Sequence, residues 1–120
     1  MGDNSSLGKL GQLAAEKLLR QKGYEILAAN YRRGRCEIDL IARRDGYTVF
    51  VEVKTRSNSR YGAPREAVTP AKQRHIIRAA WAYVAEFALT GDMRFDVVEV
   101  FVQNEKIWAR HLENAFQDRF

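Results

Sequence analysis

The sequence contains little cysteine and proline and no long apolar stretch. Its single cysteine, Cys36, cannot form a disulfide within the chain, which is typical of proteins in the reducing cytoplasm. No apolar run approaches the ~20 residues that a membrane-spanning helix requires, and no secretory signal is visible. We therefore expect a cytoplasmic protein that has no membrane partner.

The length and the charge indicate one basic domain. A chain of 120 residues has the size of a single ordinary domain, so we expect one domain over residues 1–120. Within it, residues 1–5 are expected to form a flexible tail and residues 113–120 a C-terminal tail. The net charge of +5 favours an anionic partner, and nucleic acid is the commonest partner of this kind.

A β-hairpin is the clearest local signal in the chain. Asp45 and Gly46 separate two stretches that are rich in β-branched and apolar residues. An Asp-Gly pair favours a type I′ turn, because both central residues of that turn have positive φ. The turn predicts that Arg44 faces Tyr47, and this pairing fixes the register of both strands.

The predicted register brings acidic residues together. Asp39 is expected opposite Glu52, and Glu37 opposite Lys54. Because side chains alternate between the two faces of a strand, these four residues share one face of the hairpin. The other face is expected to be the core, and it carries Ile38, Leu40, Val49, Val51 and Val53.

The facing carboxylates indicate a metal site. Two such charges ~4 Å apart repel by roughly 4 kcal/mol at an effective dielectric of about 20, and a divalent cation would offset this repulsion. Mg²⁺ or Mn²⁺ prefers oxygen ligands, so Asp39, Glu52 and the Val53 carbonyl are the predicted metal ligands. Lys54 would then stand near the water or the scissile phosphate, which suits metal-assisted phosphodiester hydrolysis.

The alternative is a solvated sheet face, on which Glu37 and Lys54 form a cross-strand ion pair. Glu52 favours the metal site over this alternative. It interrupts the apolar run of residues 49–53. A buried carboxylate costs several kcal/mol unless it is paired or bound to a metal.

Ile38-Asp39 followed by Glu52-Val53-Lys54 resembles the signature of PD-(D/E)XK nucleases. A longer ordered pattern extends the likeness, and it comprises Ala14-Ala15-Glu16, Gly23 to Leu27, Asn30-Tyr31-Arg32, Glu37 to Ile41, Phe50 to Arg56, Gly62, Val68, Lys72, Arg74, Ala80 and Arg94 to Val97. In that order the chain resembles the YraN family of bacterial proteins, which is similar to Holliday-junction resolvases and restriction-endonuclease-like folds. It departs from the pattern at two positions, where Ile38 replaces the proline of the motif and Cys36 stands in place of an expected glycine.

The resemblance implies an α/β fold, a restriction-endonuclease-like three-layer sandwich whose central mixed sheet is flanked by helices. It also implies a nuclease-type catalytic site that contains Glu16, Asp39, Glu52 and Lys54. On the helical pattern alone Glu16 lies away from the apolar stripe of its helix. A solvated helix carboxylate is therefore the alternative for this residue.

The pattern along the chain predicts the order of the elements. A first helix is expected over residues 6–22 and ends at Gly23. Thr69 and Pro70 predict the start of a second helix that continues to residue 87, because threonine is a good N-cap and proline a good first helical residue. Strands are expected over residues 24–31, 94–102 and 106–112, and a short helix is expected over residues 113–120. The apolar faces of the helices are Leu7, Leu10, Ala14 and Leu18 in the first, and Ile76, Ile77, Ala80, Val84 and Phe87 in the second.

Basic residues close to the hairpin predict contacts with nucleic acid. Some lie in a polar loop over residues 55–64, where cations can contact a phosphate and an aromatic ring can stack on a base. Others lie in the first two turns of the second helix, where cations oppose the helix dipole and their presence suggests phosphate contacts. The alternatives are a simple linker and a solvated basic face. The predicted nucleic-acid-binding residues are Arg56, Arg60, Tyr61, Lys72, Arg74 and Arg78.

These features favour a Mg²⁺-dependent or Mn²⁺-dependent endonuclease that acts on DNA, on branched or damaged DNA if the likeness to resolvases extends to the substrate. One alternative is a nucleic-acid-binding module that keeps the fold without cleaving. Another is an interaction protein that uses its hairpin face to form a homodimer. The first hypothesis needs Asp39, Glu52 and Lys54 together with a metal, the second needs only the basic surface, and the third needs neither.

Overall fold

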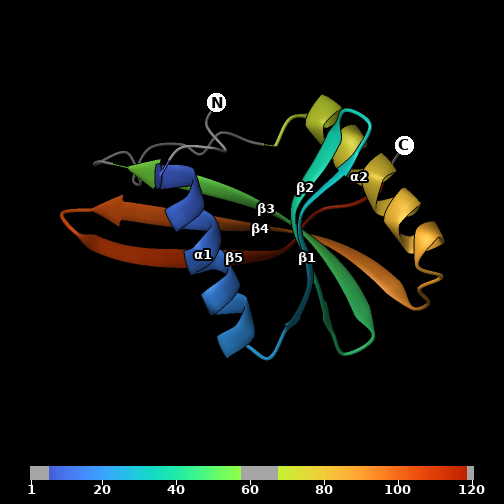
Figure 1. Cartoon of the computed structure of the whole chain (residues 1–120), viewed down its shortest axis with the longest axis horizontal. Helices are drawn as coiled ribbons and strands as arrows, with labels where there is room; N and C mark the ends of the chain where they lie inside the picture. Colours follow the sequence, from blue (N-terminus) through green and yellow to red (C-terminus); the bar gives the residue numbers. More distant parts are fainter. Residues whose placement is uncertain (1–5, 58–67, 119–120) are drawn as a thin grey trace.

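The chain forms one five-stranded mixed sheet that is flanked by two helices, as a computed structural model shows for residues 6–57 and 68–118 (Figure 1). The elements are α1 (Ser6–Gln21), β1 (Glu25–Arg33), β2 (Cys36–Arg44), β3 (Tyr47–Ser57), α2 (Pro70–Glu86), β4 (Asp92–Gln103) and β5 (Lys106–Phe116). The strands lie in the order β1-β2-β3-β4-β5. Only β3 and β4 pair in parallel, and α2 lies in the connection between them.

The two helices cover different faces of the sheet. Ile41 and Phe50 pack in one buried cluster with α2, whereas Leu40 and Val51 pack in a second cluster with α1. Neighbouring residues of a strand point to opposite faces, so the sheet separates two apolar layers. The predicted three-layer α/β sandwich with a central mixed sheet is confirmed. In the part of the chain that the structure describes, no helix is long and apolar enough to cross a membrane.

The predicted β2–β3 hairpin forms with its expected turn. Asp45 and Gly46 both have positive φ, at 52° and 82°, and Arg44 pairs with Tyr47. The ladder continues to Leu40 opposite Val51 and ends there.

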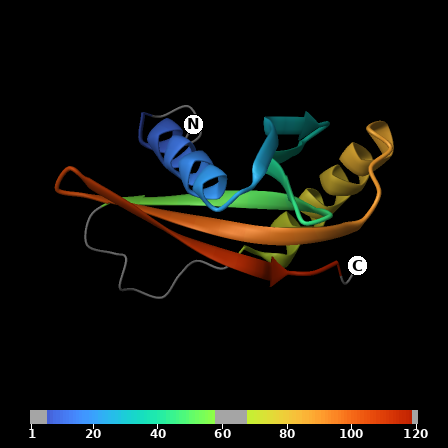
Figure 2. The ribbon, with the colours of Figure 1, turned by 90° about the horizontal axis from the view of Figure 1, so that it is seen from below.

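The predicted continuation of this ladder to Asp39–Glu52 and Glu37–Lys54 is therefore wrong. Beyond Leu40, β2 turns away from β3 and stays paired with β1 alone. Figure 2 shows the end of the β1–β2 hairpin standing apart from β3, β4 and β5. Tyr31 of β1 packs there against Tyr83 of α2, with ring centroids 5.0 Å apart. Ile38 likewise joins the cluster under α2, so it does not share a face with Leu40 as predicted.

Helix α1 has the predicted length, but it turns a different face to the sheet. Its end is fixed by Gly23, which has a φ of 90°, and by a hydrogen bond from the Tyr24 amide to the Leu19 carbonyl at 2.9 Å. The buried residues of the helix are Gly11, Ala15 and Leu19. The predicted stripe is wrong at its centre, where Leu10 is exposed and lines a shallow apolar groove together with Leu13, Ile107 and Trp108.

Helix α2 begins as predicted. The Thr69 hydroxyl accepts a hydrogen bond from the Lys72 amide at 3.2 Å, and Pro70 is the first helical residue. Ile76, Ile77, Ala80 and Tyr83 are buried. The prediction that Phe87 belongs to the buried face is wrong, because Phe87 is the C-cap residue and its side chain is exposed.

The last strand is longer than predicted. β5 runs to Phe116, so the short helix expected from residue 113 does not form over residues 113–116. Phe116 is buried and stacks on Phe95 of β4, with ring centroids 5.2 Å apart. This packing holds the end of β5 against the sheet. Trp81 and Trp108 are both exposed in the single chain.

Candidate metal and nucleic-acid site

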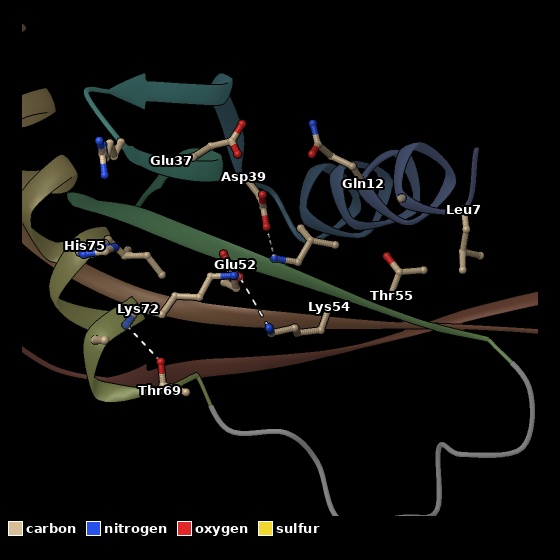
Figure 3. A pocket seen from close by; sticks show the side chains of 15 residues that line it. Leu7, Gln12, Glu37, Asp39, Glu52, Lys54, Thr55, Thr69, Lys72 and His75 are labelled. Atoms are coloured by element: carbon tan, nitrogen blue, oxygen red, sulfur yellow. Dashed lines mark hydrogen bonds and ion pairs between the residues drawn. The ribbon is translucent and has the colours of Figure 1, made fainter. Parts of the chain in front are cut away.

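A cavity of about 650 Å³ lies directly beyond the last β2–β3 pair, where β2 leaves β3 (Figure 3). The beginnings of α1 and α2 border it together with the two strands. Its lining is Leu7, Gly8 and Gln12 from α1, Arg35, Glu37 and Asp39 from the β1–β2 hairpin, Glu52, Val53, Lys54 and Thr55 from β3, and Thr69, Ala71, Lys72, His75 and Ile76 at the start of α2. Predicted site residues from β2, β3 and α2 therefore meet in one place.

Asp39 reaches β3 with its side chain. Its Oδ2 atom accepts a hydrogen bond from the Val53 amide at 2.7 Å. This bond holds the half-buried carboxylate beside Val53 at the point where the backbone ladder has ended. Asp39 and Val53, both predicted metal ligands, are thus neighbours. The Asp39 side chain joins them, and no backbone pairing of β2 with β3 reaches this far.

Glu52 is a buried carboxylate with two cationic neighbours. Its side chain is 5% exposed, and its Oε2 atom lies 2.6 Å from Lys72 Nζ and 3.8 Å from Lys54 Nζ. Because Phe50, two residues earlier, packs under α2, alternation directs Glu52 to the α2 face of the sheet. Glu52 is buried, as the sequence argument assumed, and Lys72 is a charged partner that spacing alone did not identify.

Glu37 and Lys54 do not pair across the strands. Glu37 Oε2 lies 3.6 Å from Arg32 Nε, while Lys54 is directed to Glu52. The alternative of a solvated face with a Glu37–Lys54 ion pair is therefore wrong. Lys54 instead lines the cavity, where its ammonium group lies close to the buried carboxylate.

The donor set fits a hard divalent cation. Asp39 and Glu52 supply carboxylate oxygens, and Val53, whose carbonyl is the predicted third ligand, lines the same cavity. Within residues 6–57 and 68–118, no group of three or more His, Cys, Asp or Glu side chains is arranged to hold a metal ion. Few protein oxygens are typical of Mg²⁺ or Mn²⁺, which keep several waters and complete their coordination with substrate phosphate.

Glu16, which the resemblance implies as a site residue, lies outside the cavity lining. Its carboxylate lies 3.5 Å from the Arg20 guanidinium on the same helix. Gln12, one turn earlier, lines the cavity in its place, and Figure 3 shows its amide on the α1 side of the site. The role of Glu16 remains a prediction.

The predicted nucleic-acid contacts divide into separate groups. Lys72 lines the cavity, whereas Arg74 and Arg78 lie on the exposed side of α2. Arg56 points away from solvent, because its side chain is only 18% exposed and lies 3.7 Å from the buried Glu99.

Arg60 and Tyr61 lie outside the described residues.

Sequence reasoning missed Gln12 and Thr55, which have no charge to mark them. The signal that could have indicated Thr55 is Gly11, since a glycine within a helix often marks close packing.

Residues 11–100 match the Uncharacterised protein family UPF0102. The chain belongs to this family. The match confirms the resemblance to the YraN family, because UPF0102 and YraN are the same family. Four residues of the cavity lining, Asp39, Glu52, Lys54 and Lys72, lie within the matched segment.

Relatives in the UPF0102 family align over nearly the whole chain. A UPF0102 protein of Chloroherpeton thalassium is 44% identical over 119 residues, which cover 98% of this chain and 88% of that protein. One of Flavobacterium psychrophilum is 37% identical over 97% of this chain and 98% of its own length. One of Syntrophomonas wolfei is 41% identical over 94% and 99%.

A solved structure described as "Crystal structure of SSO0001" is a more distant match. It aligns with 93% of this chain at 17% identity and a TM-score of 0.35. The chain spans 52% of the length of that protein.

Proposed function

We propose that this member of the UPF0102 family is a nuclease that hydrolyses phosphodiester bonds in DNA with the help of Mg²⁺ or Mn²⁺. The observation that carries the proposal is the meeting of Asp39, Glu52, Val53 and Lys54 in one cavity. Two carboxylates beside a lysine provide ligands for a divalent cation and a positive charge for a phosphate. We also propose that the protein is cytoplasmic.

Each residue has a distinct role in this proposal. Asp39, which its bond to the Val53 amide holds in place, and the buried Glu52 bind the cation. When bound, the cation supplies a Lewis acid for the phosphate. Lys54 is fixed on β3 and stabilises the negative charge that develops on the phosphate in the transition state.

The surroundings of the cavity support an anionic substrate. Lys72 and His75 face the cavity, and Arg74 and Arg78 extend the basic surface along the exposed side of α2. A polyanion that enters the cavity would meet these cations before it reaches the carboxylates. The likeness to resolvases noted from the sequence favours branched or damaged DNA as the substrate.

Cleavage assays test the proposal. The full chain is incubated with labelled duplex, single-stranded, flap and four-way DNA in Mg²⁺, in Mn²⁺ and in a chelator. We expect cleavage that requires a divalent cation and falls by at least about a hundredfold in Glu52→Gln and Lys54→Met. Glu113→Gln, which changes an exposed carboxylate outside the cavity, is the matched control and should retain activity.

Calorimetric titration with Mn²⁺ separates metal binding from turnover. Asp39→Ala and Glu52→Ala should each remove the binding that the unaltered protein shows. Binding of equal strength in all three proteins would reject the assignment of the ligands.

The second candidate is a DNA-binding module that does not cleave. It is favoured by the 2.6 Å contact between Lys72 and Glu52, because this contact gives the buried carboxylate a partner without a metal. DNA binding in chelator with no cleavage of any substrate, and no heat of Mn²⁺ binding, would support this candidate over the nuclease.

A further inference from the structure

The Lys72 ammonium group lies against the Glu52 carboxylate, where a metal ion bound by Glu52 would have to lie. Lys72 Nζ stands 2.6 Å from Glu52 Oε2, and the Lys72 side chain is 48% exposed while that of Glu52 is 5% exposed. The ammonium group therefore covers the carboxylate from the side of the cavity that meets solvent. A cation that approaches Glu52 through the cavity competes with this group.

The charge balance requires one lysine to move when a divalent cation binds. Glu52 already has two ammonium groups within 4 Å, so a cation of charge +2 at the same carboxylate would face two like charges. Repulsion of this kind is relieved most easily by the side chain that can move into water at small cost.

Lys72 is the lysine that can move. Lys54 lies on β3, only two residues from Glu52 on the same strand face, and its side chain is 23% exposed. Lys72 lies in the first turn of α2, and half of its side chain is already in contact with solvent. The positive end of the α2 dipole also disfavours a cation at this position.

We propose that Lys72 is an internal counter-ion for Glu52. A divalent cation displaces Lys72 from the Glu52 carboxylate, and the ammonium group can then move toward the phosphate of the substrate. This inference rests on the proposed function, and it assigns to Lys72 the role of a positioning residue. In the metal-free protein Lys72 holds the Glu52 carboxylate at the cavity. After displacement the same ammonium group remains at the cavity mouth, because the Thr69 cap fixes the first turn of α2.

Loss of the Lys72 charge should raise the affinity for the metal and lower the stability of the metal-free protein. Lys72→Met removes the competing charge, so the free protein should bind Mn²⁺ about tenfold more tightly in calorimetric titration without DNA. The same variant should melt at a lower temperature than the unaltered protein in chelator, and this difference should disappear in saturating Mn²⁺.

Two further variants control the experiment. Lys72→Arg keeps a positive charge and should return the Mn²⁺ affinity to within about threefold of the unaltered protein, which a purely steric role for the side chain would not predict. Lys106→Met removes an exposed lysine at the start of β5, outside the cavity, and should change neither affinity nor melting. Lys72→Gln serves in place of Lys72→Met if the latter does not fold by circular dichroism.

The outcomes distinguish this inference from the proposed function. Mn²⁺ binding that is equal or weaker in Lys72→Met overturns the displacement of Lys72 and leaves the metal site intact. A complete absence of Mn²⁺ binding in every protein, Lys72→Met included, overturns the metal site itself. Tighter binding in Lys72→Met with recovery in Lys72→Arg supports both.

Discussion

Gly11 of α1 lies so close to Thr55 of β3 that a Cβ atom on Gly11 would stand 1.9 Å from Thr55 Oγ1 and 2.9 Å from the Cβ and Cγ2 atoms of the same side chain. Thr55 is a residue of the cavity wall, and Gln12, the neighbour of Gly11, is another. The absence of a side chain at Gly11 therefore sets how closely α1 approaches the site.

Gly11→Ala should destabilise the protein by about 2 kcal/mol or more, because the new methyl group must displace the helix or the strand. This loss opposes the gain of up to about 1 kcal/mol that alanine normally brings to a helix interior. Urea denaturation of the two proteins measures the difference. Adding Thr55→Ala to Gly11→Ala should recover part of the loss, since it removes two of the three close atoms. Strictly additive effects of the two substitutions would contradict the contact.

The same glycine explains why the face of α1 could not be predicted from its leucines. Apolar periodicity assumes that the largest side chains face the core, which selects Leu7, Leu10 and Leu18. The helix instead uses small residues, Gly11 and Ala15, to approach the sheet closely, and Leu10 is left exposed. Local signals were sufficient where the cause is local, as for the positive φ at Asp45 and Gly46 in the hairpin turn.

The bond between Asp39 and the Val53 amide gives a second prediction. Asp39→Ala leaves a half-buried amide without this acceptor, so we expect a loss of about 1 to 3 kcal/mol in chelator. Asp39→Asn keeps an oxygen that can accept the same bond, and its stability should stay within about 1 kcal/mol of the unaltered protein. Urea denaturation without metal compares the three proteins. An equal loss in both variants would show that the charge of Asp39, rather than its hydrogen bond, contributes the stability.

The buried Asp96 supports a prediction on pH. Asp96 is fully buried, and its carboxylate accepts hydrogen bonds from Arg94, His111 and the Asn114 amide at 2.7 to 2.9 Å. Burial alone would raise the pKa of Asp96, but the hydrogen bonds from His111, Arg94 and Asn114 outweigh it and lower the pKa below its ordinary value of 3.8. The carboxylate thus joins β4 to the end of β5.

Because the pKa of Asp96 is lower in the folded than in the unfolded chain, its contribution to stability is complete above about pH 4 and is lost as the pH falls through the folded value. Asp96→Asn should cost about 3 kcal/mol at pH 7, since the variant leaves the half-buried Arg94 beside a neutral group. Urea denaturation between neutral and acidic pH should show this difference shrinking below about pH 4. Asp92→Asn, at an exposed position of β4, is the control and should show a small difference throughout. A difference that stays constant into strong acid would contradict the assignment.

The sequence alone could indicate some residues of the cavity lining but not how the cavity is built. Asp39, Glu52 and Lys54 were expected on one face from the alternation of the hairpin, and they do line one cavity, although the ladder on which that expectation rested ends at Leu40. The partner of Glu52 could not be inferred in the same way, because Lys72 arrives from α2 through the connection between β3 and β4. The cavity itself depends on the separation of β2 from β3 at Leu40. The edge-to-face contact of Tyr31 with Tyr83 that accompanies this separation joins residues 52 positions apart.

Arg56 and Arg74 differ in their exposure and should therefore affect DNA binding differently. Each phosphate contact on duplex DNA releases counter-ions, so the logarithm of the binding constant should fall with the logarithm of salt concentration by about 0.9 per contact. Arg74 is exposed on α2, and Arg74→Ala should weaken binding to unrelated sequences and reduce this slope by about one. Arg56 is directed to the buried Glu99 instead, so Arg56→Ala should leave the slope unchanged and lower the midpoint of urea denaturation.

Fluorescence anisotropy with labelled duplex DNA, in chelator and over a series of salt concentrations, measures both slopes. A reduced slope for Arg56→Ala with unchanged stability would mean that Arg56 leaves Glu99 and contacts phosphate in the complex. Equal slopes for Arg74→Ala and the unaltered protein would remove the exposed side of α2 from the DNA interface, and the cations within the cavity would then be the contacts to test next.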